Sequence, residues 1–162
     1  MNEKLINLLI VDDEEQFLNS ISKRLNVRGF NVIAVDRGEK AIAAAKEQPI
    51  DIALVDLKMP GINGEETLQR LKEAYQWMEI VILTGHGSVE SAADCTRKGA
   101  YSYLQKPCEL DKLLEVLVSA YKKKVMNRRN IDEKKIESLM KVAIGESPRE
   151  ILQSLKKLDV GD

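Results

Sequence analysis

The chain has 162 residues, of which 44% are hydrophobic and 31% are charged, as in an ordinary globular protein. The formal net charge of −1 argues against a protein that coats nucleic acid, and no apolar stretch is long enough to span a bilayer. The apolar run Leu5–Val11 is too short for a secretory signal and is followed by acids. Cys95 and Cys108 follow no metal or redox spacing, so we expect a soluble cytoplasmic protein with reduced thiols.

Short apolar runs recur along the chain and predict strands. They are Leu8–Val11, Val32–Val35, Ile52–Val55, Ile80–Leu83 and a weaker Tyr101–Leu104, which Ser102 interrupts. Because the first four are continuous rather than alternating, they indicate strands that are buried on both faces. Such burial is typical of a parallel sheet covered by helices.

Helical patterns lie between and after these runs. Apolar spacing and helix-ending residues predict five helices: Phe17–Leu25 before Gly29, Ala41–Lys46 before Pro49, one through Leu68 and Leu71 to Tyr75, Val89–Arg97 before Gly99, and one through Leu110–Leu117. Strictly alternating strands and helices predict a doubly wound α/β fold with right-handed crossovers. Ligands of such folds bind beyond the carboxyl ends of the strands.

Polar residues follow these predicted strands at the edge where a ligand would bind. Asp12 and Asp13 follow the first run, and Asp56 follows the third. Thr84 follows the fourth run, and Lys106 comes after the fifth. Clustered carboxylates in a partly dry pocket call for a hard divalent cation, and Mg²⁺ fits because it also leaves room for phosphate oxygens. An acid there could form an aspartyl phosphate, with Thr84 and Lys106 offsetting its charge.

Acids at a helix start also have a simpler explanation, because they stabilise the positive end of the helix dipole. For Glu14 and Glu15 this remains the favoured interpretation. For Asp12 and Asp13 we prefer the metal-binding interpretation, because Asp56, Thr84 and Lys106 also follow predicted strands at the same edge.

Together, these residues resemble those of two-component response-regulator receiver domains over residues 4–124. The family's acid pair corresponds to Asp12-Asp13, and its phosphoacceptor, in a D-x-x-M-P-x-x-x-G loop, to Asp56 in DLKMPGING. Its remaining site residues correspond to the switch hydroxyl Thr84, the switch aromatic Tyr103, and the lysine before a cis-linked proline, Lys106-Pro107. The resemblance implies a chemotaxis-receiver-like, flavodoxin-like (βα)5 sheet with strand order 2-1-3-4-5.

The resemblance also implies a phosphorelay function. A histidine kinase or phosphotransfer protein would donate a phosphoryl group to Asp56, with Mg²⁺ held by Asp13, Asp56 and the Lys58 backbone carbonyl, and by Asp12 largely through water. Thr84 and Lys106 would then be drawn in, Tyr103 would rotate inward, and the surface of the fourth helix, fifth strand and fifth helix would change. The protein would be a signalling protein with phosphoryl-transfer and autodephosphorylation activity rather than a metabolic enzyme.

Two further features of the family bear on this chain. The side chains two positions after the acceptor and two after the switch hydroxyl tune phosphoryl loss, and here they are Lys58 and His86. The stretches TGHG and GAYSYLQKP are similar to receivers that precede σ54-type activator domains. We expect no such ATPase domain here, because 162 residues are too few.

Charge divides the chain near Lys122–Lys124, which predicts a receiver domain at 1–124 and a helical extension at 125–162. Residues 1–121 hold 14 basic and 19 acidic residues, a net of −5, whereas residues 122–162 hold 11 and 7, a net of +4. Capping boxes at Asn130–Glu133 and Ser147–Glu150 predict two short helices, the first ending at Gly145. Their apolar stripes are Ile136, Leu139, Met140 and Ala143, and Ile151, Leu152, Leu155 and Leu158.

A two-helix extension of this size cannot bury a sufficient core alone, so we expect it to pack on the receiver, on a second copy or on a partner. Its positive charge leaves open a small DNA-binding transcriptional regulator. Interleaved acids and the absence of aromatic residues after Tyr121 make nucleic acid the weaker alternative. An aspartyl-phosphate phosphohydrolase is weaker still, because Lys58 stands where such enzymes generally carry a second acid.

Overall fold

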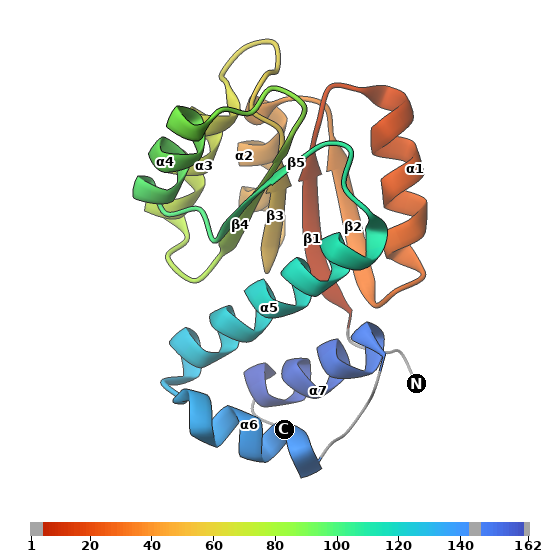
Figure 1. The fold of residues 1–162 in the computed structure, drawn as a ribbon, viewed down its shortest axis with the longest axis vertical. Helices are drawn as coiled ribbons and strands as arrows, with labels where there is room; N and C mark the ends of the chain where they lie inside the picture. Colours follow the sequence, from red (N-terminus) through yellow and green to blue (C-terminus); the bar gives the residue numbers. More distant parts are fainter. Residues whose placement is uncertain (1–4, 143–146, 161–162) are drawn as a thin grey trace.

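A computed structural model describes residues 5–142 and 147–160 (Figure 1). Five parallel strands form one sheet in the order β2-β1-β3-β4-β5. The strands are Ile6–Val11 (β1), Phe30–Val35 (β2), Ile52–Val55 (β3), Glu79–Thr84 (β4) and Ser102–Gln105 (β5). The predicted doubly wound fold and its strand order are therefore confirmed. The direction of the crossovers changes between β1 and β3, which are neighbours in the sheet.

Helices cover both faces of this sheet (Figure 1). They are α1 (Glu15–Asn26), α2 (Gly38–Glu47), α3 (Gly64–Ala74), α4 (Val89–Arg97) and α5 (Leu110–Arg129). Strand β1 shows why its sequence is continuously apolar: Leu8 and Ile10 belong to the core under α1 and α5, whereas Leu9 and Val11 belong to the core under α2 and α3. Both faces of the strand are buried, as the apolar runs predicted.

The strand register brings the polar strand ends together. Val11 of β1 pairs with Val55 of β3, so Asp12 and Asp56 follow side by side at the same edge. The Asp56 amide donates to the Val11 carbonyl over 3.0 Å. On the other side of the site, the Lys106 amide donates to the Thr84 carbonyl over 2.8 Å.

Two further helices follow α5, namely α6 (Glu133–Val142) and α7 (Pro148–Val160). Helix α7 lies along α5, near the end of the sheet opposite the strand ends described above (Figure 1). Ile136, Leu152 and Leu155 are buried and join the core under α1 and α5. Helix α5 is continuous through Lys124, so the composition change at that residue falls inside a helix.

Ion pairs add to the apolar contact between α5 and α7. The Lys124 ammonium pairs with the Asp51 carboxylate just before β3, and lies 3.7 Å from Asp159 Oδ2 on α7. Arg128 reaches Asp159 Oδ1 over 3.2 Å, and Lys156 reaches Asp51 Oδ2 over 3.5 Å. Asp51 and Asp159 are both buried, and buried carboxylates need such partners. Several basic groups of the C-terminal region are thus engaged within the chain.

The predicted caps of the two C-terminal helices are partly wrong. Asn130 does not cap α6: it ends α5 in a left-handed conformation with φ 54°, and Asp132 caps α6 by accepting from the Lys135 amide over 2.8 Å. Asp132 is nearer to the first helical residue, so it can reach the free amides that Asn130 cannot. Ser147 caps α7 as predicted, accepting from the Glu150 amide over 3.2 Å.

The apolar stripes of these helices are only partly covered. Leu139 is 36% exposed, whereas Met140, Ile151 and Leu158 are half-buried. Ala143 and Gly145 lie outside the described residues. Among the helices described, none is long and apolar enough to cross a membrane.

Candidate functional site

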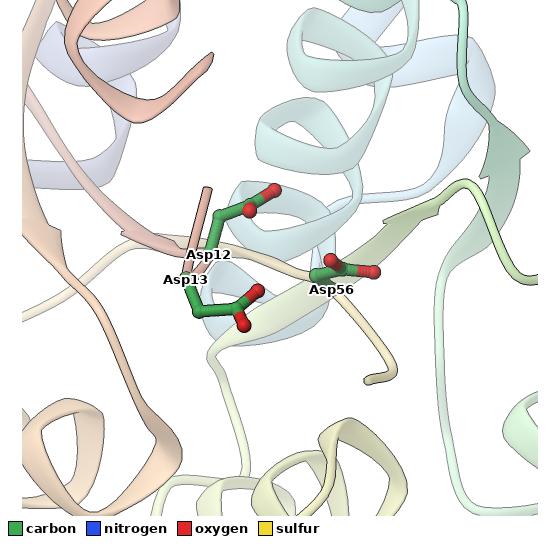
Figure 2. Close-up of side chains that lie close together, drawn as sticks. All are labelled: Asp12, Asp13 and Asp56. Atoms are coloured by element: carbon green, nitrogen blue, oxygen red, sulfur yellow. The ribbon is translucent and has the colours of Figure 1, made fainter. Parts of the chain in front are cut away.

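Three carboxylates meet at the carboxyl ends of β1 and β3. Figure 2 shows Asp12 and Asp13 after β1 beside Asp56 after β3. One oxygen from each lies within 4.8 Å of the others. Asp12 and Asp56 are each only 2% exposed, whereas Asp13 is exposed. Carboxylates this close repel one another unless a cation offsets their charge, and the set matches the oxygen ligands that Mg²⁺ prefers.

Backbone amides hold the two buried carboxylates in place. Asp12 Oδ1 accepts from the Glu14 amide over 2.9 Å, and Asp56 Oδ1 accepts from the Leu57 amide over 2.8 Å. Burial raises the pKa of the Asp12 carboxyl, while its hydrogen bonds to Lys106 and to the Glu14 amide oppose the increase. Each carboxylate keeps its Oδ2 atom turned toward Lys106.

Lys106 supplies the positive charge of the site. Its ammonium nitrogen lies 2.6 Å from Asp12 Oδ2, 3.1 Å from Glu14 Oε1 and 3.6 Å from Asp56 Oδ2. The same nitrogen lies 4.2 Å from the centre of the Phe17 ring. Burial by itself would lower the pKa of Lys106. The hydrogen bonds to Asp12 and Glu14 have the larger combined effect, so the pKa is raised above its ordinary value. The peptide bond to the following proline is cis, as the resemblance predicted.

Thr84 and Tyr103 connect this cluster to α4. Thr84 ends β4 fully buried, and its hydroxyl accepts from the His86 amide over 3.1 Å. Tyr103 on β5 is half-buried, and its hydroxyl accepts from the Ser88 amide over 3.3 Å. The Tyr103 hydroxyl also lies 2.6 Å from the Ser91 hydroxyl in the first turn of α4.

A cleft of about 780 Å³ opens above the carboxylates. Asp13 and Asp56 line it together with Lys58 and His86, which the sequence placed two residues after the acceptor and two after Thr84. Lys58 and His86 are both exposed. Most of the residues that the sequence predicted for the site thus lie at this edge of the sheet or on the loops around the cleft, whereas Tyr103 lies within β5.

Sequence reasoning missed three contacts of the site. Glu14 stands at the start of α1, as the sequence predicts, but its side chain makes no capping hydrogen bond and accepts from Lys106, a contact that the sequence does not indicate. Phe17 was assigned to the core, and its spacing carries no sign of the contact with Lys106. Ser88 and Ser91 form a reciprocal capping box on α4, which the spacing of two serines three residues apart could have indicated.

Comparisons with known proteins agree with this geometry. The sequence model of the response regulator receiver domain family matches residues 8–118. An NtrX-like response regulator of Rickettsia conorii is 35% identical over 131 residues, which are 80% of this chain and 28% of that protein. The alginate biosynthesis transcriptional regulatory protein AlgB of Pseudomonas aeruginosa is 34% identical over 112 residues, which are 69% of this chain and 25% of AlgB.

Solved structures show the same fold. A CheY-like receiver domain protein of Methanospirillum hungatei superposes with a TM-score of 0.74 at 27% identity, covering 76% of this chain and 99% of that one. A chain of the CheX–CheY–BeF3–Mg²⁺ complex of Borrelia burgdorferi gives 0.68 at 28% identity, covering 72% and 89%. The present chain spans about 28% of the length of the NtrX-like relative. On the sequence match, the fold and the strand-end residues together, the chain belongs to the response regulator receiver domain family.

Proposed function

We propose that this cytoplasmic protein accepts a phosphoryl group on Asp56 from a sensor histidine kinase or phosphotransfer protein, and that this switches a protein-binding surface. The observation that carries the proposal is the convergence of Asp12, Asp13 and Asp56 within 4.8 Å, with the Lys106 ammonium between Asp12 and Asp56. A structural ion cluster would not require an open cleft above it, whereas phosphoryl transfer does.

Asp56 is oriented for nucleophilic attack. Its Oδ1 atom is occupied by the Leu57 amide, which leaves Oδ2 to attack the phosphorus of a phosphohistidine. The new P–O bond forms as the P–N bond breaks, and the electron pair leaves with the imidazole of the donor. Lys106, 3.6 Å from Oδ2, is placed to offset negative charge on the transferring group.

The acidic residues fit a magnesium ion. Asp13, Asp56 and the Lys58 backbone carbonyl would hold Mg²⁺, with Asp12 acting through water, and the bound ion would offset charge on the phosphoryl oxygens. The fit rests on the all-oxygen donor set, on the two buried acids and on the cleft that the exposed Asp13 lines.

The phosphoryl group would bias a two-state equilibrium. Lys106 and Thr84 would move toward its oxygens, and Tyr103 would exchange its contacts at the start of α4 for an inward position. The surface formed by α4, β5 and α5 would change as a result. Water entering the cleft beside Lys58 and His86 would later hydrolyse the aspartyl phosphate.

The role of the C-terminal helices is a separate part of the proposal. Residues 125–162 serve protein contacts in this proposal, because buried apolar side chains of α6 and α7 pack on the receiver. Lys156 and Arg128 face buried acids, which supports this assignment. The DNA-binding alternative draws support from relatives that are named transcriptional regulatory proteins, and salt-dependent binding of the full chain to duplex DNA would favour it.

The proposal is tested by phosphorylating the full chain with a small phosphodonor such as acetyl phosphate in the presence of Mg²⁺. Intact-mass spectrometry should detect one phosphoryl group on the wild-type chain and none on Asp56→Asn. Chelation of Mg²⁺ should abolish the reaction. Phosphorylation of the Asp56→Asn variant to the wild-type level would overturn the assignment of the acceptor.

A further inference from the structure

Lys106 is held by two carboxylates of very different burial. The Asp12 side chain is 3% exposed and the Glu14 side chain is 59% exposed. Both lie within hydrogen-bond distance of the Lys106 nitrogen, whereas Asp56 Oδ2, at 3.6 Å, does not. The ammonium therefore lies closer to Asp12 and Glu14, on the α1 side of the site, than to Asp56, with which it forms a longer ion pair.

We propose that Glu14 is a positioning residue: its carboxylate draws the Lys106 ammonium toward α1, and this lowers the affinity of the site for a phosphoryl group on Asp56. The inference rests on the function proposed above, because it concerns the same site. Release of Lys106 from Glu14 would be the step that lets the ammonium reach the phosphoryl oxygens.

The difference in burial decides which contact breaks. A buried carboxylate that loses a cationic partner is left in an unfavourable state, so Lys106 should keep its bond to Asp12. An exposed carboxylate that loses the same partner is solvated by water at little cost, so Glu14 is the contact that yields. Each phosphorylation would then carry the modest cost of breaking an exposed ion pair.

The side chain of Glu14 contacts Lys106 and does not cap the helix that it precedes. Its backbone amide, which supports Asp12 Oδ1 over 2.9 Å, remains whatever side chain stands there. Phe17, one turn further along α1, places its ring against the same ammonium. The first turn of α1 thus holds Lys106 through two side chains.

The test measures how tightly the full chain binds BeF3⁻, an analogue of the phosphoryl group, by calorimetry at saturating Mg²⁺. Glu14→Gln keeps the length of the side chain and removes its charge. Glu14→Asp keeps the charge but is shorter by about 1.5 Å, which takes its carboxylate beyond hydrogen-bond distance of the Lys106 nitrogen in its present position. Glu15→Gln is the matched control, because the exposed Glu15 side chain is the next acid and makes no described contact with Lys106.

Both Glu14 variants should bind BeF3⁻ about threefold more tightly than wild type, the size expected for an exposed ion pair. Glu15→Gln should bind as wild type does. In a Lys106→Met background, Glu14→Gln should have no effect, because the residue through which it acts is gone. The affinity for Mg²⁺ alone should be unchanged in Glu14→Asp, which keeps the charge next to the metal-binding carboxylates.

Three results would overturn the inference. The first is wild-type affinity for BeF3⁻ in both Glu14→Gln and Glu14→Asp. The second is tighter binding confined to Glu14→Gln, which would indicate a long-range charge effect. The third is an effect of Glu14→Gln that persists without Lys106. Failure of the function itself is recognisable separately. A wild-type chain that binds no BeF3⁻ with Mg²⁺ would refute the phosphoacceptor site, whatever the variants do.

Discussion

The hydroxyl oxygens of Tyr103 and Ser91 lie 2.6 Å apart and join β5 to the first turn of α4. Ser91 also belongs to the capping box that begins this helix, so one side chain serves both the helix end and the tyrosine. The proposed inward rotation of Tyr103 therefore requires a change at the start of α4. This coupling gives a physical reason for the surface of α4 to respond to the site.

Substitution Ser91→Ala should loosen Tyr103, because it removes the hydroxyl partner and leaves only the Ser88 amide. We expect a loss of about 1 kcal/mol of stability from the cap and changed ring resonances of Tyr103 by NMR. Ser88→Ala is the control: it removes the capping oxygen but keeps the backbone amide that Tyr103 uses. Equal changes of the Tyr103 resonances in both variants would mean that the serine hydroxyl does not hold the ring.

Glycine is required at position 64, in the first turn of α3. A Cβ there would collide with the backbone carbonyl of Asp56 and the Cα of Leu57, neither of which can move without displacing the acceptor. We expect Gly64→Ala to lower the free energy of unfolding by roughly 2 kcal/mol and to reduce phosphorylation of Asp56. Urea denaturation and intact-mass spectrometry measure the two effects.

The matched control is Gly85→Ala, because a Cβ at Gly85 meets nothing within 4 Å. Its unfolding midpoint should stay close to that of the wild type. A Gly64→Ala variant as stable and as readily phosphorylated as Gly85→Ala would show that the loop after β3 tolerates the added methyl group.

The contact between α5 and α7 should contribute to the stability of the receiver. Asp159 on α7 is 1% exposed, and it accepts from the Tyr121 hydroxyl and from Arg128. Asp159→Ala should cost about 2 kcal/mol, because it leaves buried polar groups without their partner while Lys124 keeps Asp51. Urea denaturation of the full chain measures the loss.

Lys157→Gln provides the comparison, since Lys157 is an exposed residue of the same helix. It should change stability by less than about 0.5 kcal/mol. Equal unfolding midpoints for Asp159→Ala and wild type would indicate that α7 is a detachable tail rather than part of the folded unit.

Lys58 and His86 should control the access of water to the aspartyl phosphate, because both line the cleft beside Asp56. Lys58→Ala and His86→Ala open the cleft, and each should speed dephosphorylation by about threefold. Loss of the phosphoryl group with time, followed by mass spectrometry, gives the rate. Lys23→Ala, an exposed residue of α1, should leave the rate unchanged. Wild-type rates in both cleft variants would exclude the gating role.

Local features of the sequence predicted much of this protein. The run IALV is apolar at every position because both faces of β3 are buried, and it therefore marked a central strand. The bounds of α4 agree with the predicted Val89–Arg97, because Gly99, which has a positive φ, is a strong helix-ending signal. The weak run at Tyr101–Leu104 reflects an edge strand, which neighbours cover on one side only.

Sequence by itself determined the sheet and the residues at its carboxyl edge, because burial imposes a pattern on neighbouring residues that can be read along the chain. Only the tertiary structure decided the partner of Glu14, since Lys106 lies 92 residues away and an exposed acid carries no mark of its contact. The same holds for α7. Its apolar stripe indicated that the helix packs on something, but only the folded structure shows that it packs on α5, next to the buried ion pair of Lys124 and Asp51. Contacts between distant residues depend on where whole elements are placed, and the periodicity of one element does not contain that information.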